Sequence, residues 1–302
     1  MDNRKIRKII KAKSTLEGAG VSLKRGFGFS EVPDLDPFLL FDDFSSDNPR
    51  YFIKGFPWHP HRGIETITYV LTGDVEHGDS IGNSGIISSG DIQWMTAGSG
   101  IIHQEMPKGD KDGRMAGFQL WANLPSNDKM INPRYRGITA REIPSANLGQ
   151  GVMAKIICGQ IGNIKGPVQD IRIEPEYLDI SMEPKARYIH KTSPSHTVFA
   201  YVIDGDGIFC DEKKPYSYDV EGENYFDFTR KPFIEQGNII LFDKGDKITI
   251  ATDDKAIRFL LISGKPIGEP VAWYGPIVMN TQEELRIAFE EYNNGTFIKY
   301  KN

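Results

Sequence analysis

Histidine is scarce in this chain, and half of the histidines stand at spacings that suit metal binding. The 302 residues include six, of which His59 and His61 lie two apart, while His103 lies two before Glu105. Side chains two apart on a β-strand share a face, so both pairs can point into one barrel if each lies on a regular strand. Imidazole and carboxylate suit Fe(II), Mn, Ni, Cu(II) or Zn. The pattern therefore predicts a centre for a first-row metal ion with open coordination positions.

The remaining histidines and the two cysteines lack this clustering. His77 has no partner at ligand spacing and is predicted to be an exposed loop residue. His190 and His196 are six apart, and no histidine follows the turn at Gly237-Asn238. We therefore expect the second half of the chain to lack a metal site. That half would be structural or would offer a partner surface. Cys158 and Cys210 are interpreted as small buried apolar residues.

Short β-strands are the elements that would position these residues. Turn-forming residues recur at short intervals, and the runs between them, such as 65–71, 238–242 and 256–262, are rich in Ile, Val, Thr, Tyr and Phe. Dipeptides such as Gly-Asp and Gly-Asn between the runs fit hairpin turns. This pattern is typical of an antiparallel all-β protein.

One helix is predicted near residues 281–293, where Thr281 and Glu284 form a capping box at its start. The two halves of the chain also repeat an order of strand and turn, most clearly in residues 66–74 and 197–206. Such internal similarity indicates a duplicated β-barrel.

The strand pattern loosens between about residues 124 and 151, where Pro, Ser, Asn and Gly gather. We therefore expect two antiparallel β-barrels in tandem. Residues 1–135 would form the metal-binding barrel, and residues 136–302 a second barrel without metal ligands that ends in the helix.

Composition and charge exclude several classes of protein. Lys and Arg number 36 against 41 Asp and Glu, a net charge of −5, so the chain lacks the positive field needed for non-specific nucleic-acid binding. No apolar run approaches the roughly 18 residues that cross a bilayer, and the N-terminus lacks the apolar stretch of a signal peptide. Two cysteines are too few for a disulfide framework. We expect a cytoplasmic protein without membrane contact, or a nuclear one if the source is eukaryotic.

The N-terminal segment 4–13 is locally basic, with six Lys or Arg residues interleaved with isoleucines. We interpret it as a charged edge strand or a solvated lead-in. Contact with an acidic partner is the alternative.

The first half of the chain resembles the cupin superfamily and, more closely, the pirin family. The residues of the two cupin motifs occur in order, although Thr96 stands where many cupins have proline: Gly55, His59, His61, Glu65, Gly73, Gly90, Gly98 and His103. The stretches that are similar to those of pirins are 37–44, 55–66, 90–107 and 117–125. The two-barrel length also matches.

The resemblance implies a bicupin of two jelly-roll barrels with one Fe(II), bound by His59, His61, His103 and Glu105. Glu65 holds the position that supplies the metal carboxylate in many other cupins. We interpret it as an outer partner that orients an imidazole N–H or fills the same cavity. Several side chains are candidates for the wall above the metal, with core packing as the alternative for each: Arg62, Gln93, Trp94, Met95, Phe118, Gln119 and Trp121.

The resemblance also implies a function. Pirins are similar to cupin flavonol dioxygenases, so we expect a quercetin 2,3-dioxygenase type of reaction on a flavonol-like molecule and dioxygen, with Glu105 accepting the 3-hydroxyl proton. A second hypothesis is a metal- and redox-dependent regulator, because pirins of animals act as nuclear cofactors that bind transcription regulators. A metal-storing or vestigial barrel is a third. The resemblance favours a monomer, and the overall charge argues against direct DNA binding.

Overall fold

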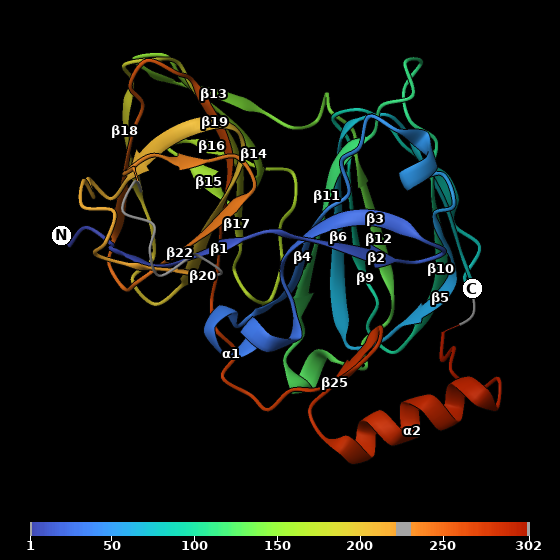
Figure 1. Cartoon of the computed structure of the whole chain (residues 1–302). Helices are drawn as coiled ribbons and strands as arrows, with labels where there is room; N and C mark the ends of the chain where they lie inside the picture. Colours follow the sequence, from blue (N-terminus) through green and yellow to red (C-terminus); the bar gives the residue numbers. More distant parts are fainter. Residues whose placement is uncertain (1, 222–230, 301–302) are drawn as a thin grey trace. The chain divides into compact units, whose positions relative to one another are not determined.

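The computed structural model describes residues 2–221 and 231–300, and β-strands dominate it (Figure 1). The strands form two compact units, and the chain passes from one unit to the other after Ala12, Glu142 and Pro266. We call the unit built from residues 13–142 and the segment after Pro266 the histidine unit, and the other the second unit. All predicted metal ligands belong to the histidine unit.

The histidine unit contains two antiparallel sheets in the jelly-roll arrangement of a cupin barrel. The four-stranded sheet has the order β5 (Phe56–His61), β10 (Ile101–Pro107), β7 (Val75–Asp79) and β8 (Ser84–Ile87). The seven-stranded sheet has the order β12 (Arg134–Ile138), β9 (Ile92–Thr96), β6 (Ile64–Thr72), β11 (Ala116–Asn123), β4 (Phe38–Asp43), β3 (Val21–Phe27) and β2 (Lys13–Glu17).

The C-terminal segment of the chain completes this unit. Strands β25 (Ala272–Tyr274) and β26 (Ile277–Met279) form a hairpin that precedes helix α2 (Gln282–Asn293). Thr281 and Glu284 form the predicted capping box of α2. Val278 packs in a core cluster with residues of β6 and β9, and Leu285 lies in a second cluster against which Ile102 of β10 packs. A short helix, α1 (Val32–Leu35), precedes β4.

The second unit is built on one large sheet and a closed apolar core. The main path of its sheet has the order β13 (Ser145–Gly149), β14 (Val152–Cys158), β17 (Glu176–Met182), β24 (Ile257–Gly264), β19 (Thr197–Phe209), β22 (Asn238–Phe242), β1 (Ile6–Lys11) and β20 (Asp219–Glu221). Further strands are β18 (Arg187–Lys191), β21 (Ile234–Glu235), β23 (Lys247–Ala251), and the hairpin of β15 (Gln160–Ile161) and β16 (Ile164–Lys165). The buried cluster includes Phe209, Phe242 and Phe259.

The compact units differ from the predicted segments 1–135 and 136–302 at both ends of the chain. Strand β1 pairs with β22 of the second unit, whereas the helix expected on the second barrel lies in the histidine unit. The physical reason is burial of apolar surface, because Ile9 and Ile10 of β1 are almost fully buried where they pair with β22, as are Leu285 and Ala288 of α2 in its unit. A break in local sequence pattern does not reveal such long-range packing.

Most of the basic N-terminal segment, Ile6–Lys11, forms strand β1 inside this sheet rather than an edge strand or a free arm. β1 lies between β22 and β20. Arg4 is 1% exposed, and its guanidinium donates to the hydroxyl of Thr192 and to the carbonyls of Asp243, Ser193 and His196. The buried arginine is therefore not available to an acidic partner.

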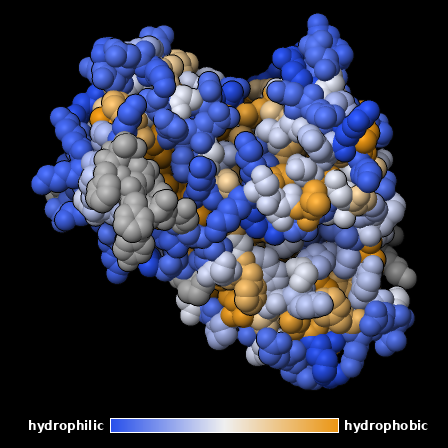
Figure 2. Space-filling model, viewed as in Figure 1, coloured by the Kyte–Doolittle hydropathy of each residue, from blue (hydrophilic) through white to orange (hydrophobic). Residues whose placement is uncertain are grey.

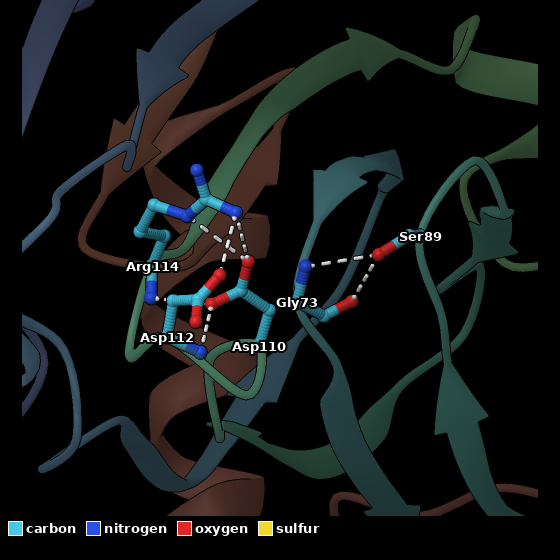
Figure 3. Close-up of polar contacts among 5 residues, drawn as sticks. All are labelled: Gly73, Ser89, Asp110, Asp112 and Arg114. Carbon is cyan, nitrogen blue, oxygen red and sulfur yellow. Dashed lines mark hydrogen bonds and ion pairs between the residues drawn. The ribbon is translucent and has the colours of Figure 1, made fainter.

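Tight loops close the strands of the histidine unit (Figure 3). The hydroxyl of Ser89 accepts from the backbone N–H of Gly73 at 3.0 Å and donates to the Gly73 carbonyl at 3.2 Å. Gly73 has φ +91°, and a Cβ there would lie 2.8 Å from the Met115 sulfur, so the turn requires glycine. In the loop before β11, Arg114 pairs with Asp110 and Asp112.

The surface seen in Figure 2 is largely hydrophilic, with apolar side chains in separate patches. Among the described residues, no helix has both the length and the apolar character needed to span a membrane.

Candidate metal centre

Three histidines converge inside the histidine unit. His59 and His61 lie on β5, and His103 lies on the neighbouring strand β10, directly opposite His59 in the antiparallel register. The Nε2 atom of His59 is 3.0 Å from the Nε2 atom of His61 and 3.0 Å from that of His103. In the part of the chain that the structure describes, these three residues form the one cluster with metal-ligand geometry.

The spacing of these nitrogens fits a metal ion. Two nitrogens bound about 2.1 Å from one ion, at a right angle, lie about 3.0 Å apart, whereas a tetrahedral angle would separate them by about 3.4 Å. The separations of 3.0 Å from His59 to His61 and from His59 to His103 therefore match adjacent positions around one ion, and the ligand atoms of the three histidines all lie within 4.8 Å of one another. An octahedral ion held by three imidazoles would keep further positions for a carboxylate, water or substrate oxygen.

The other ring nitrogen of each histidine has its own partner. The Nδ1 atom lies 2.8 Å from the Pro57 carbonyl in His59 and 3.1 Å from the Pro276 carbonyl in His61. Because a carbonyl can only accept, both Nδ1 atoms carry the proton and both Nε2 lone pairs face the cluster. In His103, Nδ1 lies 3.4 Å from the hydroxyl of Tyr135.

Burial keeps two of the three rings neutral. His61 and His103 are each 1% exposed. Burial lowers the pKa of both well below the usual value, and the neighbouring His59 lowers it further. Neutral imidazole is the form that binds metal, so the electrostatics agree with the geometry.

Glu105 shares the inward face of β10 with His103, but its carboxylate lies outside the three-histidine group. One oxygen accepts from the Thr68 hydroxyl at 2.9 Å and the other from the Gln119 amide at 2.9 Å. Glu105 also lines a small cavity of about 20 Å³. The structure thus orients this carboxylate with two neutral donors.

Glu65 accepts a hydrogen bond of 2.6 Å from the hydroxyl of Thr96, its register partner on β9. Burial raises the pKa of its carboxyl. Since the three Nδ1 atoms lie against Pro57, Pro276 and Tyr135, the described contacts orient the rings without Glu65.

A pocket of about 770 Å³ opens beside His59 and His61. Of the predicted wall residues, Gln119 and Trp121 line it. The Trp121 ring meets His61 edge to face with centroids 5.0 Å apart, and its indole N–H donates to Gln119 at 3.2 Å. The remaining lining residues include Phe29, Phe56, Trp58, Trp273 and Tyr274.

The other predicted wall residues do not line this pocket. Phe118 precedes Gln119 on β11 and therefore points to the opposite face, where it stacks on Phe41. Arg62 is 2% exposed and reaches the C-terminal segment, where it donates to the Phe297 carbonyl and pairs with Glu291. The three predicted residues on β9 are buried in that strand: Gln93, Trp94 and Met95.

His77 is not the exposed loop residue that the sequence indicated. It is half-buried on β7, opposite Glu105 in register, and its ring stacks on Tyr135 with centroids 5.7 Å apart. In the second unit, His190 lies 2.6 Å from a carboxylate oxygen of Glu176. Neither residue belongs to a three-ligand group among the described residues.

Sequence reasoning missed Tyr135, Thr68 and Pro276. The Pro276 contact is made by a backbone carbonyl 215 residues from its histidine, so no pattern of residue types marks it. Thr68 lies on the strand that follows the first histidine pair, and the alternation of faces along β6 is a signal that could have found it.

Comparison with known proteins gives consistent matches along most of the chain. Residues 20–122 match the family profile described as Pirin, and residues 177–298 match the one described as Pirin C-terminal cupin domain. Pirin-like protein 2 of Arabidopsis thaliana is 41% identical over 97% of this chain and 85% of its own length. Pirin of Homo sapiens is 36% identical over 97% of this chain and 93% of its own.

A solved structure gives the same result for the fold. The crystal structure of quercetin 2,3-dioxygenase from Acinetobacter baumannii superposes with a TM-score of 0.84. It is 28% identical in sequence, over 98% of this chain and 99% of that one.

Proposed function

This chain belongs to the pirin family, and from that premise we propose that it is an iron-dependent dioxygenase of the quercetin 2,3-dioxygenase type. The observation that carries the proposal is the convergence of three imidazole Nε2 atoms beside an aromatic-lined pocket. The name of the Acinetobacter baumannii structure supports the same reaction class.

His59, His61 and His103 would hold Fe(II), with Glu105 as the fourth ligand. The bound ion would supply Lewis acidity toward a substrate oxygen and would bring the substrate and dioxygen together. Imidazole ligands whose Nδ1 protons are already directed to carbonyls need little reorganisation to bind it, which supports this donor set.

The residues around the ion would bind and deprotonate the substrate. Trp121 and the other aromatic rings of the wall suit a flat flavonol. Glu105 would accept the proton of the flavonol 3-hydroxyl, since Thr68 and Gln119 hold its carboxylate in place without neutralising it. Trp121 donates to Gln119 and so couples the pocket wall to this carboxylate.

Turnover tests the proposal. The protein is loaded anaerobically with Fe(II), quercetin and oxygen are added, and flavonol absorbance and oxygen uptake are followed together. We expect one oxygen consumed per flavonol over many turnovers, and a loss of at least about a hundredfold in His103→Ala. His196→Ala, in the second unit, serves as the control for removal of an imidazole. No turnover with iron bound would reject the dioxygenase and favour the metal-dependent regulator.

A further inference from the structure

One wall of the pocket comes from the far end of the chain. The pocket that His59 and His61 line is also lined by the last two residues of β25, Trp273 and Tyr274, and by the turn to β26, Gly275 and Pro276. We call residues 273–276 the C-terminal turn. Its Pro276 carbonyl is the acceptor beside Nδ1 of His61.

The strand after the turn is fixed to the barrel through buried polar contacts. The backbone N–H of Val278 donates to the Arg62 carbonyl at 3.1 Å. The ammonium of Lys129, a residue 2% exposed, donates to the Val278 carbonyl at 3.0 Å and to the Gly63 carbonyl at 2.9 Å. These bonds hold the C-terminal turn at a set distance from the strand that carries the histidines.

Trp273 presents a preorganised aromatic face. Its indole N–H donates to the Gly275 carbonyl at 2.6 Å, within the turn itself. Its ring lies 6.0 Å from that of Trp121 and 5.5 Å from that of Phe29, measured between centroids. Trp121 in turn contacts His61, so a continuous row of aromatic rings runs from the metal centre to Trp273.

We infer that the C-terminal turn is a substrate-binding wall of the metal site, with Trp273 as the residue that stacks on a flat aromatic substrate. The inference rests on the proposed function for the identity of the substrate. Pro276 has a positioning role, because its carbonyl sets the proton of His61 on Nδ1. A planar polyphenol therefore meets one indole from the barrel and a second from the end of the chain.

Trp273→Leu tests the inference, with Tyr51→Leu as the control. Tyr51 is an exposed aromatic residue of the same unit that does not line the pocket. The dissociation constant of quercetin is measured by equilibrium dialysis on metal-free protein, and KM, kcat and iron content on the iron-loaded protein. We expect the dissociation constant and KM to rise about three- to tenfold in Trp273→Leu, with kcat and iron content within about twofold. Trp273→Phe and the control should remain near the unsubstituted protein.

An unchanged dissociation constant in a folded Trp273→Leu protein overturns the inference, as does an equal change in Tyr51→Leu. If Trp273→Leu does not fold, hydrogen exchange of the unsubstituted protein decides: quercetin should protect residues 272–277, and absence of protection rejects the wall. The proposed function fails separately. If iron-loaded protein binds quercetin through Trp273 but takes up no oxygen, the binding wall stands and the dioxygenase proposal is rejected.

Discussion

Each histidine of the centre is oriented by a different partner. Carbonyls of Pro57 and Pro276 orient His59 and His61, while the Tyr135 hydroxyl lies against His103. Backbone carbonyls cannot be altered by replacing the residue's side chain, and they cannot donate. They are therefore dependable at keeping the metal-facing nitrogen unprotonated.

The two buried glutamates should differ in their effect on metal binding. Replacing Glu105 with Gln removes a carboxylate from the inward face of β10, and we expect iron affinity to fall by about tenfold or more. Glu65→Gln, the matched control, keeps an acceptor for Thr96 and should leave affinity within about threefold. Iron titration of both variants measures this. A larger loss in Glu65→Gln would exchange the roles of the two residues.

At the scale of elements, the β25–β26 hairpin joins the metal centre to the C-terminal helix. Lys129 is the central contact, since its ammonium meets the carbonyls of Gly63 and Val278 and the side chain of Asn123. Burial lowers the pKa of Lys129 to about 8. Three acceptors thus compensate for a buried charge that would otherwise be costly.

Lys129→Met should destabilise the protein by about 2–4 kcal/mol near pH 7, because three buried acceptors lose their donor. Urea unfolding measures the loss, and hydrogen exchange should rise in residues 272–279. Lys155→Met, on β14 of the second unit, is the control.

The pH dependence of the same variant gives an independent check. The folded pKa of Lys129, about 8, lies below the unfolded value, so the unfolded chain retains its proton as pH rises from 8 towards 10.5. As pH rises from 8 towards 10.5, the free energy of unfolding of the original protein should increase relative to that of Lys129→Met. The same increase is lost when pH is lowered from 10.5 to 8. Parallel stability curves for the two proteins would contradict the buried ammonium.

At the scale of the whole molecule, each end of the chain belongs to the unit formed mainly by the other half. The N-terminal strand β1 joins the second unit, and the segment after Pro266 joins the histidine unit. A cut between residues 135 and 136 would therefore deprive each unit of a buried element. The metal centre depends on Pro276, near the C-terminal end of the sequence, whose carbonyl lies against His61.

Ile9→Ala tests whether strand β1 supports the second unit. Ile9 is 4% exposed and pairs with Ile240 of β22, so its truncation should cost about 2–4 kcal/mol of unfolding free energy. Hydrogen exchange of backbone amides should rise in β19 and β22, while iron affinity stays unchanged. Leu16→Ala, at a side chain 71% exposed, should cost less than about 0.5 kcal/mol. If Ile9→Ala lost iron affinity, the stability of the histidine unit would depend on β1, contrary to this prediction.

The sequence by itself determined the order of short strands, the capping box of α2 and the shared face of His59 and His61, because these depend on alternation along a strand and on local turns. Family resemblance added the cupin arrangement, which the comparisons confirm. Only the tertiary structure decided that Arg62 turns to the C-terminal segment and that Phe118 packs in the core. It also decided that the Pro276 carbonyl reaches His61 and that Trp273 lines the pocket beside it. Contacts between residues more than 200 apart, some through backbone atoms, leave no periodic trace in the order of the residues.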